Sequence, residues 1–264
     1  MSSCCSSESL DQTRAVDDRY GAAALEREAC LCTPVGFDPA LLKVLPDEVV
    51  ERDYGCGDPT RWVRSGDRVL DLGSSSGKNA FICAQIVGRE GRVVGVDRNA
   101  DMLALSRGAA PVVAEAIGYS NVEFREGAIE ALESSGTDGV PLVADASVDV
   151  VLSNCVLNLV NPSARDRLLD NIRRVLAPGG RVAISDIVCD QPVPLHLQQD
   201  ADLWSGCISG AWEEQAFLDA FRSLGFEQVA YADRSVEPWK VVEGIAFRAV
   251  TLVGVLPGSR GSCC

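Results

Sequence analysis

The sequence predicts an α/β fold in which helices flank a mostly parallel sheet. From residue 68 onward, short apolar segments bounded by Gly, Ser or Asp alternate with longer segments whose apolar residues recur near helical spacing. A Gly/Ser-rich turn joins the first apolar segment directly to the first helical one. This alternation is typical of parallel strands connected by helices.

Residues 1–62 are expected to form a cysteine-containing tail and a helical cap ahead of the core. Residues 11–28 have the apolar spacing of a helix, and Asp38 followed by Pro39 has the sequence of a helix start. Tyr54-Gly55-Cys56-Gly57 is expected in a loop, because Gly and Pro cluster there.

The core is expected to span residues 63–188. The predicted strands are Val69–Leu72, Val93–Val96, Val122–Phe124, Val148–Ser153 and Arg181–Ile187, and the predicted helices are Lys78–Val87, Ala100–Ile117 and Pro162–Leu176. The Pro and Gly residues of Ala177-Pro178-Gly179-Gly180 indicate a helix stop before the fifth strand.

Residues 189–256 are expected to hold an insert followed by the last strands. Two prolines break the alternation of strand and helix between Cys189 and Ala211. A helix after Trp212 precedes segments 227–233 and 249–256, which we expect to pair antiparallel at the edge of the sheet. Residues 257–264 are expected to be a mobile tail that ends in cysteines.

The turn after the first strand predicts a site for a nucleotide-like cofactor. Gly73 and Gly77 let the backbone approach a ligand closely, and Asp97 ends the second strand where a carboxylate can bind ribose hydroxyls. NAD enzymes and S-adenosylmethionine (SAM) enzymes share both features. Asp71, which precedes the first Gly, favours SAM, because a carboxylate there lies near the ammonium group of that cofactor.

The pattern Asp-x-Gly-x-Ser-x-Gly resembles the first motif of class I SAM-dependent methyltransferases, with Ser75 in place of the family's second Gly. The resemblance implies a Rossmann-like, seven-stranded sheet and an adenine contact at Ala128 and Ile129. Met102 is placed to pack on the adenine or in the core, and Asn154 to contact SAM or to order Cys155.

Composition argues against several classes of partner. The formal net charge of −14 repels nucleic acid and anionic lipid surfaces. No apolar run is long enough to cross a membrane, and the N-terminal residues do not have the pattern of a signal peptide. These features favour a cytoplasmic protein.

Cysteines are the most informative residues outside the cofactor turn. The chain has 11 cysteines and one histidine, His196, so a His-rich metal site is excluded. Cys155 follows the fourth strand, where ligands bind in open α/β sheets, and Cys207 lies in the insert. Cys83 is expected to pack in the core, and for Cys189 packing and function are equally expected.

Three segments together resemble the cysteine motifs of arsenite SAM methyltransferases. They are Tyr54-Gly55-Cys56-Gly57, Ser153-Asn154-Cys155-Val156-Leu157-Asn158-Leu159 and Gly206-Cys207-Ile208-Ser209-Gly210-Ala211. The likeness extends from the cap to the final strands. The family's further N-terminal cysteine matches Cys32-Thr33-Pro34 best, with Cys30 as the competing position.

The resemblance implies roles for these residues. Cys155 and Cys207 would be the main ligands of trivalent arsenic, Cys56 the third thiolate, and Cys56 with Cys32 a redox pair. Thiolates suit a soft centre such as arsenic(III), whose lone pair can take the methyl group without a general base. The arsenic would arrive as a thiol conjugate, and a thiol such as thioredoxin or glutathione would reduce the disulfide.

Several alternatives stay open at this point. A class I methyltransferase could act on another small-molecule nucleophile, with its cysteines only packing, and a thiol-rich protein could bind metalloids without catalysis. Sequence does not distinguish arsenic from antimony, selenium or tellurium, or fix the number of methyl groups added, the reductant or the oligomeric state. Cys4, Cys5, Cys263 and Cys264 match no motif of the family.

Overall fold

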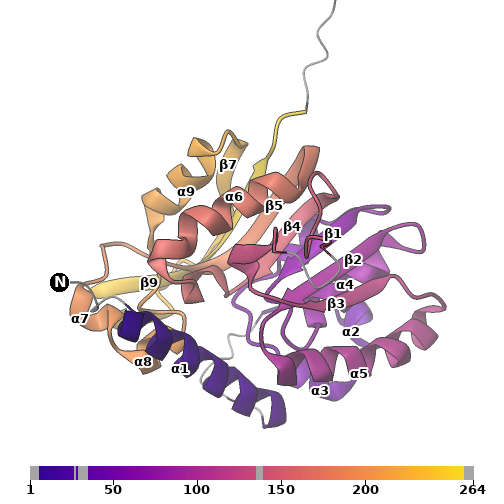
Figure 1. Cartoon of the computed structure of the whole chain (residues 1–264), viewed down its shortest axis with the longest axis horizontal. Coiled ribbons are helices and arrows are strands. Elements are labelled where there is room, and N and C mark those ends of the chain that lie inside the picture. Colours follow the sequence, from indigo (N-terminus) through magenta and orange to yellow (C-terminus); the bar gives the residue numbers. More distant parts are fainter. Residues whose placement is uncertain (1–5, 27, 29–34, 135–138, 259–264) are drawn as a thin grey trace, which may run out of the picture.

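The computed structural model describes residues 6–26, 28, 35–134 and 139–258. Within them one nine-stranded sheet forms the centre of the molecule, with the main strand order β3-β2-β1-β4-β5-β9-β7 and two short strands, β6 and β8, beside β5 and β9 (Figure 1). The strands are β1 Arg68–Leu72, β2 Arg92–Asp97, β3 Val122–Glu126, β4 Val148–Asn154, β5 Leu176–Cys189, β6 Trp212–Glu213, β7 Glu227–Arg234, β8 Lys240–Val242 and β9 Ile245–Val255.

Helices cover both faces of this sheet. The described α-helices are α1 Ser6–Leu25, α2 Pro39–Leu42, α3 Asp47–Glu51, α4 Lys78–Val87, α5 Ala100–Ile117, α6 Arg165–Val175, α7 Leu195–Gln198, α8 Ala201–Ser205 and α9 Glu214–Ser223. Four short 3-10 segments connect other elements: Pro59–Trp62, Ile129–Ala131, Leu157–Leu159 and Pro162–Ala164.

Strand pairing confirms the predicted topology. β1, β2, β3, β4 and β5 run parallel, whereas β9 pairs antiparallel with both β5 and β7. The seven strands of the main order match the predicted class I methyltransferase sheet, and β6 and β8 add two short pairings that the sequence did not predict.

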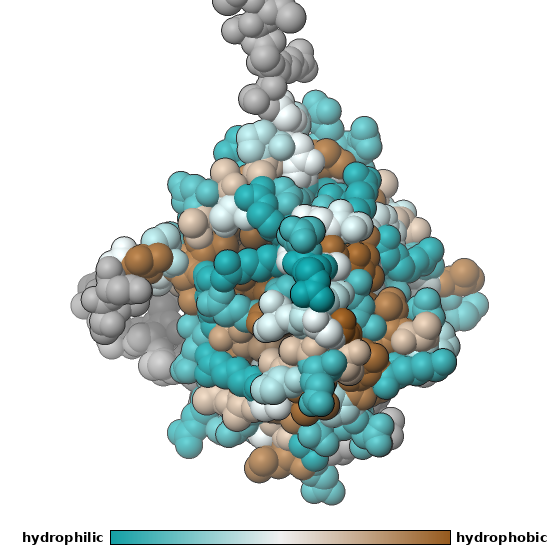
Figure 2. Space-filling model, turned by 90° about the vertical axis from the view of Figure 1, so that its right-hand side faces the viewer, coloured by the Kyte–Doolittle hydropathy of each residue, from teal (hydrophilic) through white to brown (hydrophobic). Residues whose placement is uncertain are grey.

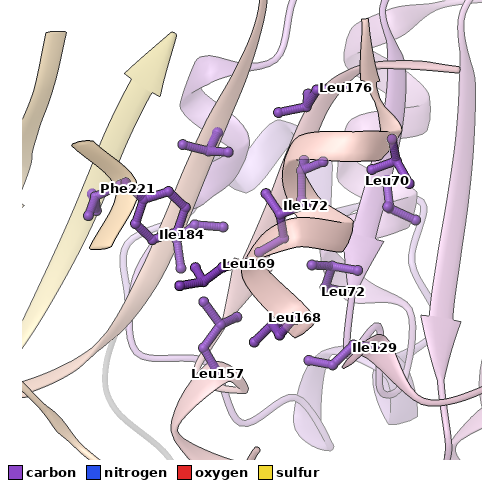
Figure 3. Packing of buried hydrophobic residues seen from close by; sticks show 14 of the residues in the cluster. Leu70, Leu72, Ile129, Leu157, Leu168, Leu169, Ile172, Leu176, Ile184 and Phe221 are labelled. Carbon is purple, nitrogen blue, oxygen red and sulfur yellow. The ribbon is translucent and has the colours of Figure 1, made fainter. Parts of the chain in front are cut away.

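Alternating side chains divide the core into two layers. Leu70 and Leu72 of β1 pack on the side of α6 and α9, with residues such as Ile172 and Phe221 (Figure 3). Val69 of β1 packs on the opposite side, with apolar residues of α4 and α5. Because neighbouring residues of a strand point to opposite faces, a sheet buried on both sides needs nearly continuous apolar strands.

The largest differences from the sequence prediction within the core lie at the two ends of α6. The predicted helix Pro162–Leu176 begins with a 3-10 turn and becomes α-helical only at Arg165. The predicted helix stop at residues 177–180 lies inside β5, because Leu176 already pairs with Val148 and the register then shifts before Arg181 pairs with Val150. The shift accommodates Gly179 with a φ of 82°.

The hydropathy of the outer surface can be followed on one face of the molecule (Figure 2). The face shown in Figure 2 is largely hydrophilic, and its hydrophobic residues lie in small separate patches. In the ranges that the structure describes, the helices are too short or too polar to cross a membrane. The proposed division at residues 62, 188 and 256 stays a prediction.

Leu70 provides a test of the core, because its side chain is fully buried between β1 and α6. We expect Leu70→Ala to lower the free energy of unfolding by about 2–5 kcal/mol, through lost apolar contact and the cavity that remains. Val112 in α5 is 54% exposed, so Val112→Ala should change it by less than about 0.5 kcal/mol. Urea unfolding measures both values, and equal effects would contradict this packing.

Candidate functional site

A cavity of about 120 Å³ lies at the carboxyl ends of the parallel strands, and we call it the cofactor cavity. The turn after β1 lines it with Gly73 and Ser75, the end of β2 with Asp97, and the end of β4 with Asn154 and Cys155. Ligands of open α/β sheets bind at this edge, at the point between β1 and β4 where the strand order changes direction.

The turn between β1 and α4 follows a left-handed path that brings its backbone into the site. Gly73 has a φ of 68°, Ser75 of 49° and Gly77 of 90°. A Cβ atom on Gly73 would lie 2.5 Å from the side chain of Val156, so a side chain at Gly73 would clash. The φ of Ser75 is one that Gly adopts at a lower conformational cost than Ser. Gly, the residue of the family motif, would therefore also fit this position.

Asp97, the last residue of the neighbouring strand β2, is hydrogen-bonded to the turn after β1. One of its carboxylate oxygens accepts a hydrogen bond from Ser75 N at 2.8 Å and the other from Asn99 N at 2.9 Å. Burial raises the pKa of Asp97 above its ordinary value. The carboxylate therefore lines the cofactor cavity in an orientation fixed by backbone amides, as expected of a group that accepts hydrogen bonds from ribose.

Asp71 is a buried carboxylate without an ion-pair or side-chain hydrogen-bond partner among the described residues. It lies in β1 and is 1% exposed. Burial raises its pKa well above the ordinary value, the charges of Asp53 and Asp97 raise it further, and contact with the backbone N–H of Ala80 lowers it without outweighing burial. Because an unpaired buried carboxylate is costly, the site is suited to a ligand that carries positive charge nearby.

The cofactor cavity brings together six of the nine residues that the sequence predicts to bind the cofactor. These six are Gly73, Ser75, Asp97, Met102, Ile129 and Asn154. Asp71, Gly77 and Ala128 do not line it, so any influence on a ligand would pass through charge or through the shape of the turns. The sulfur of Met102 accepts a hydrogen bond from Ser75 Oγ at 3.4 Å, which ties that side chain to the turn.

Helix α1 forms a wall of the cavity that the sequence did not indicate. Val16, Asp17 and Tyr20 of this helix line the cavity, and Figure 1 shows α1 crossing from α8 to α5. The helix has only a weakly apolar face, so its sequence gives little signal of a contact with the core. We find no local sequence pattern that would have identified these residues.

Polar contacts hold α1 at both ends of the site. Asp17 forms an ion pair with Arg98 at 3.1 Å, next to the end of β2. Arg19 donates a hydrogen bond to Ser205 Oγ at 2.9 Å, and the hydroxyl of Tyr20 lies 4.0 Å from Cys207 Sγ. The helix thus connects the cofactor side of the site with the segment that carries Cys207.

Cys56, Cys155 and Cys207 lie in one apolar cluster, which we call the thiol cluster. Each is less than 8% exposed, and residues such as Ile208 and Phe247 surround them. The thiol of Cys207 donates a hydrogen bond to the carbonyl oxygen of Cys155 at 3.1 Å. Cys155 lines the cofactor cavity, whereas Cys56 and Cys207 do not.

The backbone is left-handed at two of the three cysteines. Cys155 and Cys207 both have a φ of 61°, a region that costs a residue with a side chain about 1–3 kcal/mol. Such conformations persist where surrounding contacts fix them, and they occur often at functional sites. Cys155 is fixed by its own N–H, which donates to the carbonyl oxygen of Ser185 at 2.8 Å.

The thiols are protonated near neutral pH in this environment. The interaction with Cys155 and then burial raise the pKa of Cys207 well above its ordinary value. Interaction with Cys207 lowers the pKa of Cys155, but Cys56 and burial outweigh it, so that pKa also stays well above the ordinary value. Burial raises the pKa of Cys56.

The thiol cluster does not form a ready-made metal centre. Across residues 6–26, 28, 35–134 and 139–258, no three His, Cys, Asp or Glu side chains are arranged to hold a metal ion. Cys207 donates its thiol hydrogen to a backbone oxygen, so this hydrogen bond must break before that sulfur can bind arsenic. Cys4, Cys5, Cys30, Cys32, Cys263 and Cys264 lie outside the described residues.

Cys83 and Cys189 are the remaining described cysteines, and Cys189 belongs to the same apolar cluster as Cys56, Cys155 and Cys207. Cys83 is buried in α4 among apolar residues, as expected. The thiol of Cys189 donates to the carbonyl oxygen of Trp212 at 3.3 Å, and burial raises its pKa to about 12. Both therefore stay protonated, away from the lining of the cofactor cavity.

Comparison with known proteins assigns the family. The methyltransferase domain family matches residues 63–225. The chain is 38% identical over 219 residues to an arsenite methyltransferase of Aquipseudomonas alcaligenes, covering 80% of this chain and 61% of that one. It is also 38% identical over 239 residues to an arsenite methyltransferase of Halobacterium salinarum, covering 89% and 56%. The chain thus spans well under two thirds of these relatives' length.

A solved structure agrees with the sequence comparison. The crystal structure of an arsenic(III) S-adenosylmethionine methyltransferase from Chlamydomonas reinhardtii superimposes with a TM-score of 0.74 at 31% identity, covering 85% of this chain and 76% of that one. The fold, the cofactor turn and the order of the cysteine motifs are consistent with this match. The chain belongs to the arsenite S-adenosylmethionine methyltransferases, within the class I methyltransferases.

Proposed function

We propose that this protein transfers methyl groups from SAM to trivalent arsenic bound by Cys56, Cys155 and Cys207. The observation that carries the proposal is the position of Cys155, which belongs to the thiol cluster and also lines the cofactor cavity. A substrate held by that sulfur would face the cofactor. Catalysis would then consist mainly of holding two reactants in line.

The residues around the cofactor cavity fit SAM, which carries positive charge on its sulfonium and ammonium groups. The acidic residues Asp17, Asp53, Asp97 and Glu130 line the cavity, and so does Arg98, which pairs with Asp17, while Lys78 pairs with Asp53. The buried carboxylate of Asp71 in β1 has no cationic partner among the described residues. Gly73 provides the space in which a ligand approaches the backbone of the turn. When bound, SAM supplies a methyl group on a cationic sulfur, which makes that group an electrophile.

The neutral thiols fit a neutral arsenic species. Arsenous acid condenses with three thiols to give an uncharged tris-thiolate complex and three molecules of water. A thiol conjugate exchanges in the same way and releases its own thiols. Because neither route creates net charge, burial of the thiol cluster among apolar side chains does not oppose binding.

Methyl transfer to arsenic requires no proton acceptor from the protein. The arsenic lone pair forms the new bond to the methyl carbon, and the electrons of the broken carbon–sulfur bond stay on sulfur. His196 is exposed and hydrogen-bonded to Glu243 at 2.9 Å, and it does not line the cavity. The absence of histidine from the lining therefore agrees with this mechanism.

Methylation oxidises arsenic from the trivalent to the pentavalent state, so two electrons must return to it. We propose that Cys56 and Cys32 supply them by forming a disulfide, which thioredoxin or glutathione then reduces through a mixed disulfide. We also propose a cytoplasmic location, because the thiols must stay reduced between turnovers.

Cysteine substitutions test the substrate site. Incubation with SAM, arsenite and a thiol reductant should give methylated arsenic with the wild type, measured by chromatography and mass spectrometry. Cys155→Ser and Cys207→Ser should each lower the rate by about 100-fold or more, because arsenic loses a ligand that orients it. Cys83→Ala serves as control and should keep the rate. Absence of product from a wild type that binds SAM would refute the proposal.

Asp71→Asn tests the fit of the cofactor. Removal of this buried negative charge should weaken SAM about tenfold or more in titration calorimetry. S-adenosylhomocysteine keeps the ammonium group but lacks the sulfonium charge, so an equal loss for both ligands would locate the effect at the ammonium. Asp233→Asn, at an exposed position of β7, should leave both affinities unchanged. Unaltered SAM affinity of Asp71→Asn would be the contrary result.

The protonated thiols also predict a particular pH dependence. Arsenous acid and neutral thiols combine without net release of protons, so arsenite affinity should change less than about threefold between about pH 6 and pH 8. Zinc binding expels the thiol protons, so its affinity should rise steeply over the same range. Competition with a dithiol chelator at each pH measures both. Arsenite affinity that falls about tenfold or more per pH unit would show that thiolates are the starting form, because formation of the neutral complex and water would then consume protons.

A further inference from the structure

Asn158 links the two segments that carry Cys155 and Cys207. It lies three residues after Cys155, in the 3-10 turn Leu157–Leu159, and its side chain is fully buried. Its side-chain amide donates to the carbonyl oxygen of Ile187 at 2.7 Å and to that of Cys207 itself at 3.2 Å. One carboxamide thus joins the turn after β4, the strand β5 and the segment that follows α8.

Asp186 fixes the backbone of the same turn. Its carboxylate is 1% exposed, and one oxygen accepts hydrogen bonds from Leu157 N at 3.0 Å and Asn158 N at 3.4 Å. The other oxygen accepts from Ile187 N at 2.8 Å. The backbone of Asn158 is therefore hydrogen-bonded to Asp186 of β5, while its side chain is hydrogen-bonded to the Cys207 segment.

The Cys207 segment comes very close to Asn158. A Cβ atom on Gly210 would lie 1.9 Å from the carbonyl oxygen of Asn158, so the two backbones touch and Gly is required there. At this separation, a small shift of the turn after β4 moves the Cys207 segment with it. The hydrogen bond from the Asn158 side-chain amide to the carbonyl oxygen of Cys207 then fixes the relative orientation of the two segments.

Asn154 makes the corresponding link on the other side of Cys155. Its side-chain oxygen accepts from Cys56 N at 2.8 Å and Gly57 N at 3.1 Å, and its amide donates to the carbonyl oxygen of Gly57 at 2.8 Å. The two asparagines that flank Cys155 therefore each form hydrogen bonds to a segment that carries another cysteine of the thiol cluster. Asn154 also lines the cofactor cavity, whereas Asn158 does not.

We infer that Asn158 is a positioning residue that sets the separation and orientation of the Cys155 and Cys207 thiols, so that both bind one trivalent arsenic atom. This inference rests on the proposed function for the identity of the substrate. It assigns Asn158 no contact with the cofactor or with arsenic. Its effect passes through the carbonyl group of Cys207, a residue whose left-handed backbone needs such support.

Binding of phenylarsine oxide to the full chain tests this directly, because its hydrated form condenses with two thiols and releases two molecules of water. We expect Asn158→Ala to weaken that binding at least about tenfold, while SAM affinity stays unchanged. Asn171 provides a matched control, since it is also buried and its amide donates to the carbonyl oxygens of Glu130 and Arg167. Asn171→Ala should lower stability but leave both affinities unchanged.

Asn158→Ser keeps one possible donor and should fall between the wild type and Asn158→Ala, and it carries the test if Asn158→Ala does not fold. Equal loss of phenylarsine oxide binding in the Asn158 and Asn171 variants would overturn the inference, as would a wild type that does not bind the compound. A wild type that binds phenylarsine oxide but never methylates arsenite would refute the proposed function alone. In that case the comparison of variants still decides the role of Asn158.

Discussion

Both halves of the site depend on the close approach of the turn after β1 to the turn after β4. The two strands pair in parallel, with Leu72 opposite Ser153, and Ser153 Oγ donates to the carbonyl oxygen of Leu72 at 3.0 Å. Gly73 then packs against Val156 with no room for a side chain. The turn after β1 and the turn that carries Cys155 are therefore fixed relative to each other by the sheet, and little freedom remains in the direction from the cofactor cavity to Cys155.

Burial gives the thiol cluster a preference that exposure would not. Three neutral thiols that condense with arsenous acid release water and give a neutral complex. Three thiolates around a divalent cation, by contrast, give a complex with a net negative charge. Such a charge is costly in a medium of low dielectric constant, and the buried carboxylate of Asp186, whose charge raises the pKa of all three thiols, would add to the cost. The site is thus suited to trivalent elements that form neutral thiolate complexes.

The sequence predicted the parts of this molecule that depend on local pattern. Strand β1, the turn that follows it and the carboxylate at the end of β2 are signalled by short apolar segments, by Gly and by Asp at fixed spacing. The three cysteine motifs could be found because each carries Gly or Asn next to Cys, and the structure explains this. Gly55 and Gly57 leave space for Asn154 and Ser185, and Gly210 leaves space for Asn158.

Contacts between distant polar residues could not be predicted in the same way. The approach of Tyr20 to Cys207 joins residues far apart in the chain, and no periodicity encodes it. The same holds for the contact of Arg19 with Ser205. The path of the chain through Gly179 was also missed, because a Pro-Gly-Gly segment looks like a turn and only the pairing of Leu176 with Val148 makes it part of a strand.

Two contacts that α1 makes beside the cofactor cavity are weaker than those of the sheet. The ion pair of Asp17 with Arg98 joins half-exposed side chains, and such pairs contribute at most about 1 kcal/mol. The contact of Tyr20 with Cys207 is long at 4.0 Å. The turns after β1 and β4, by contrast, are held by buried hydrogen bonds and by packing that admits no extra atom. The C-terminal end of α1 is held in the same way as those turns, because Ala23 and Ala24 are buried beside Tyr54 and the Tyr54 hydroxyl donates to the carbonyl oxygen of Ala23 at 2.9 Å. The wall that α1 adds to the cofactor cavity is therefore fixed at that end by buried contacts, and its weaker contacts are those of Asp17 and Tyr20 beside the cavity.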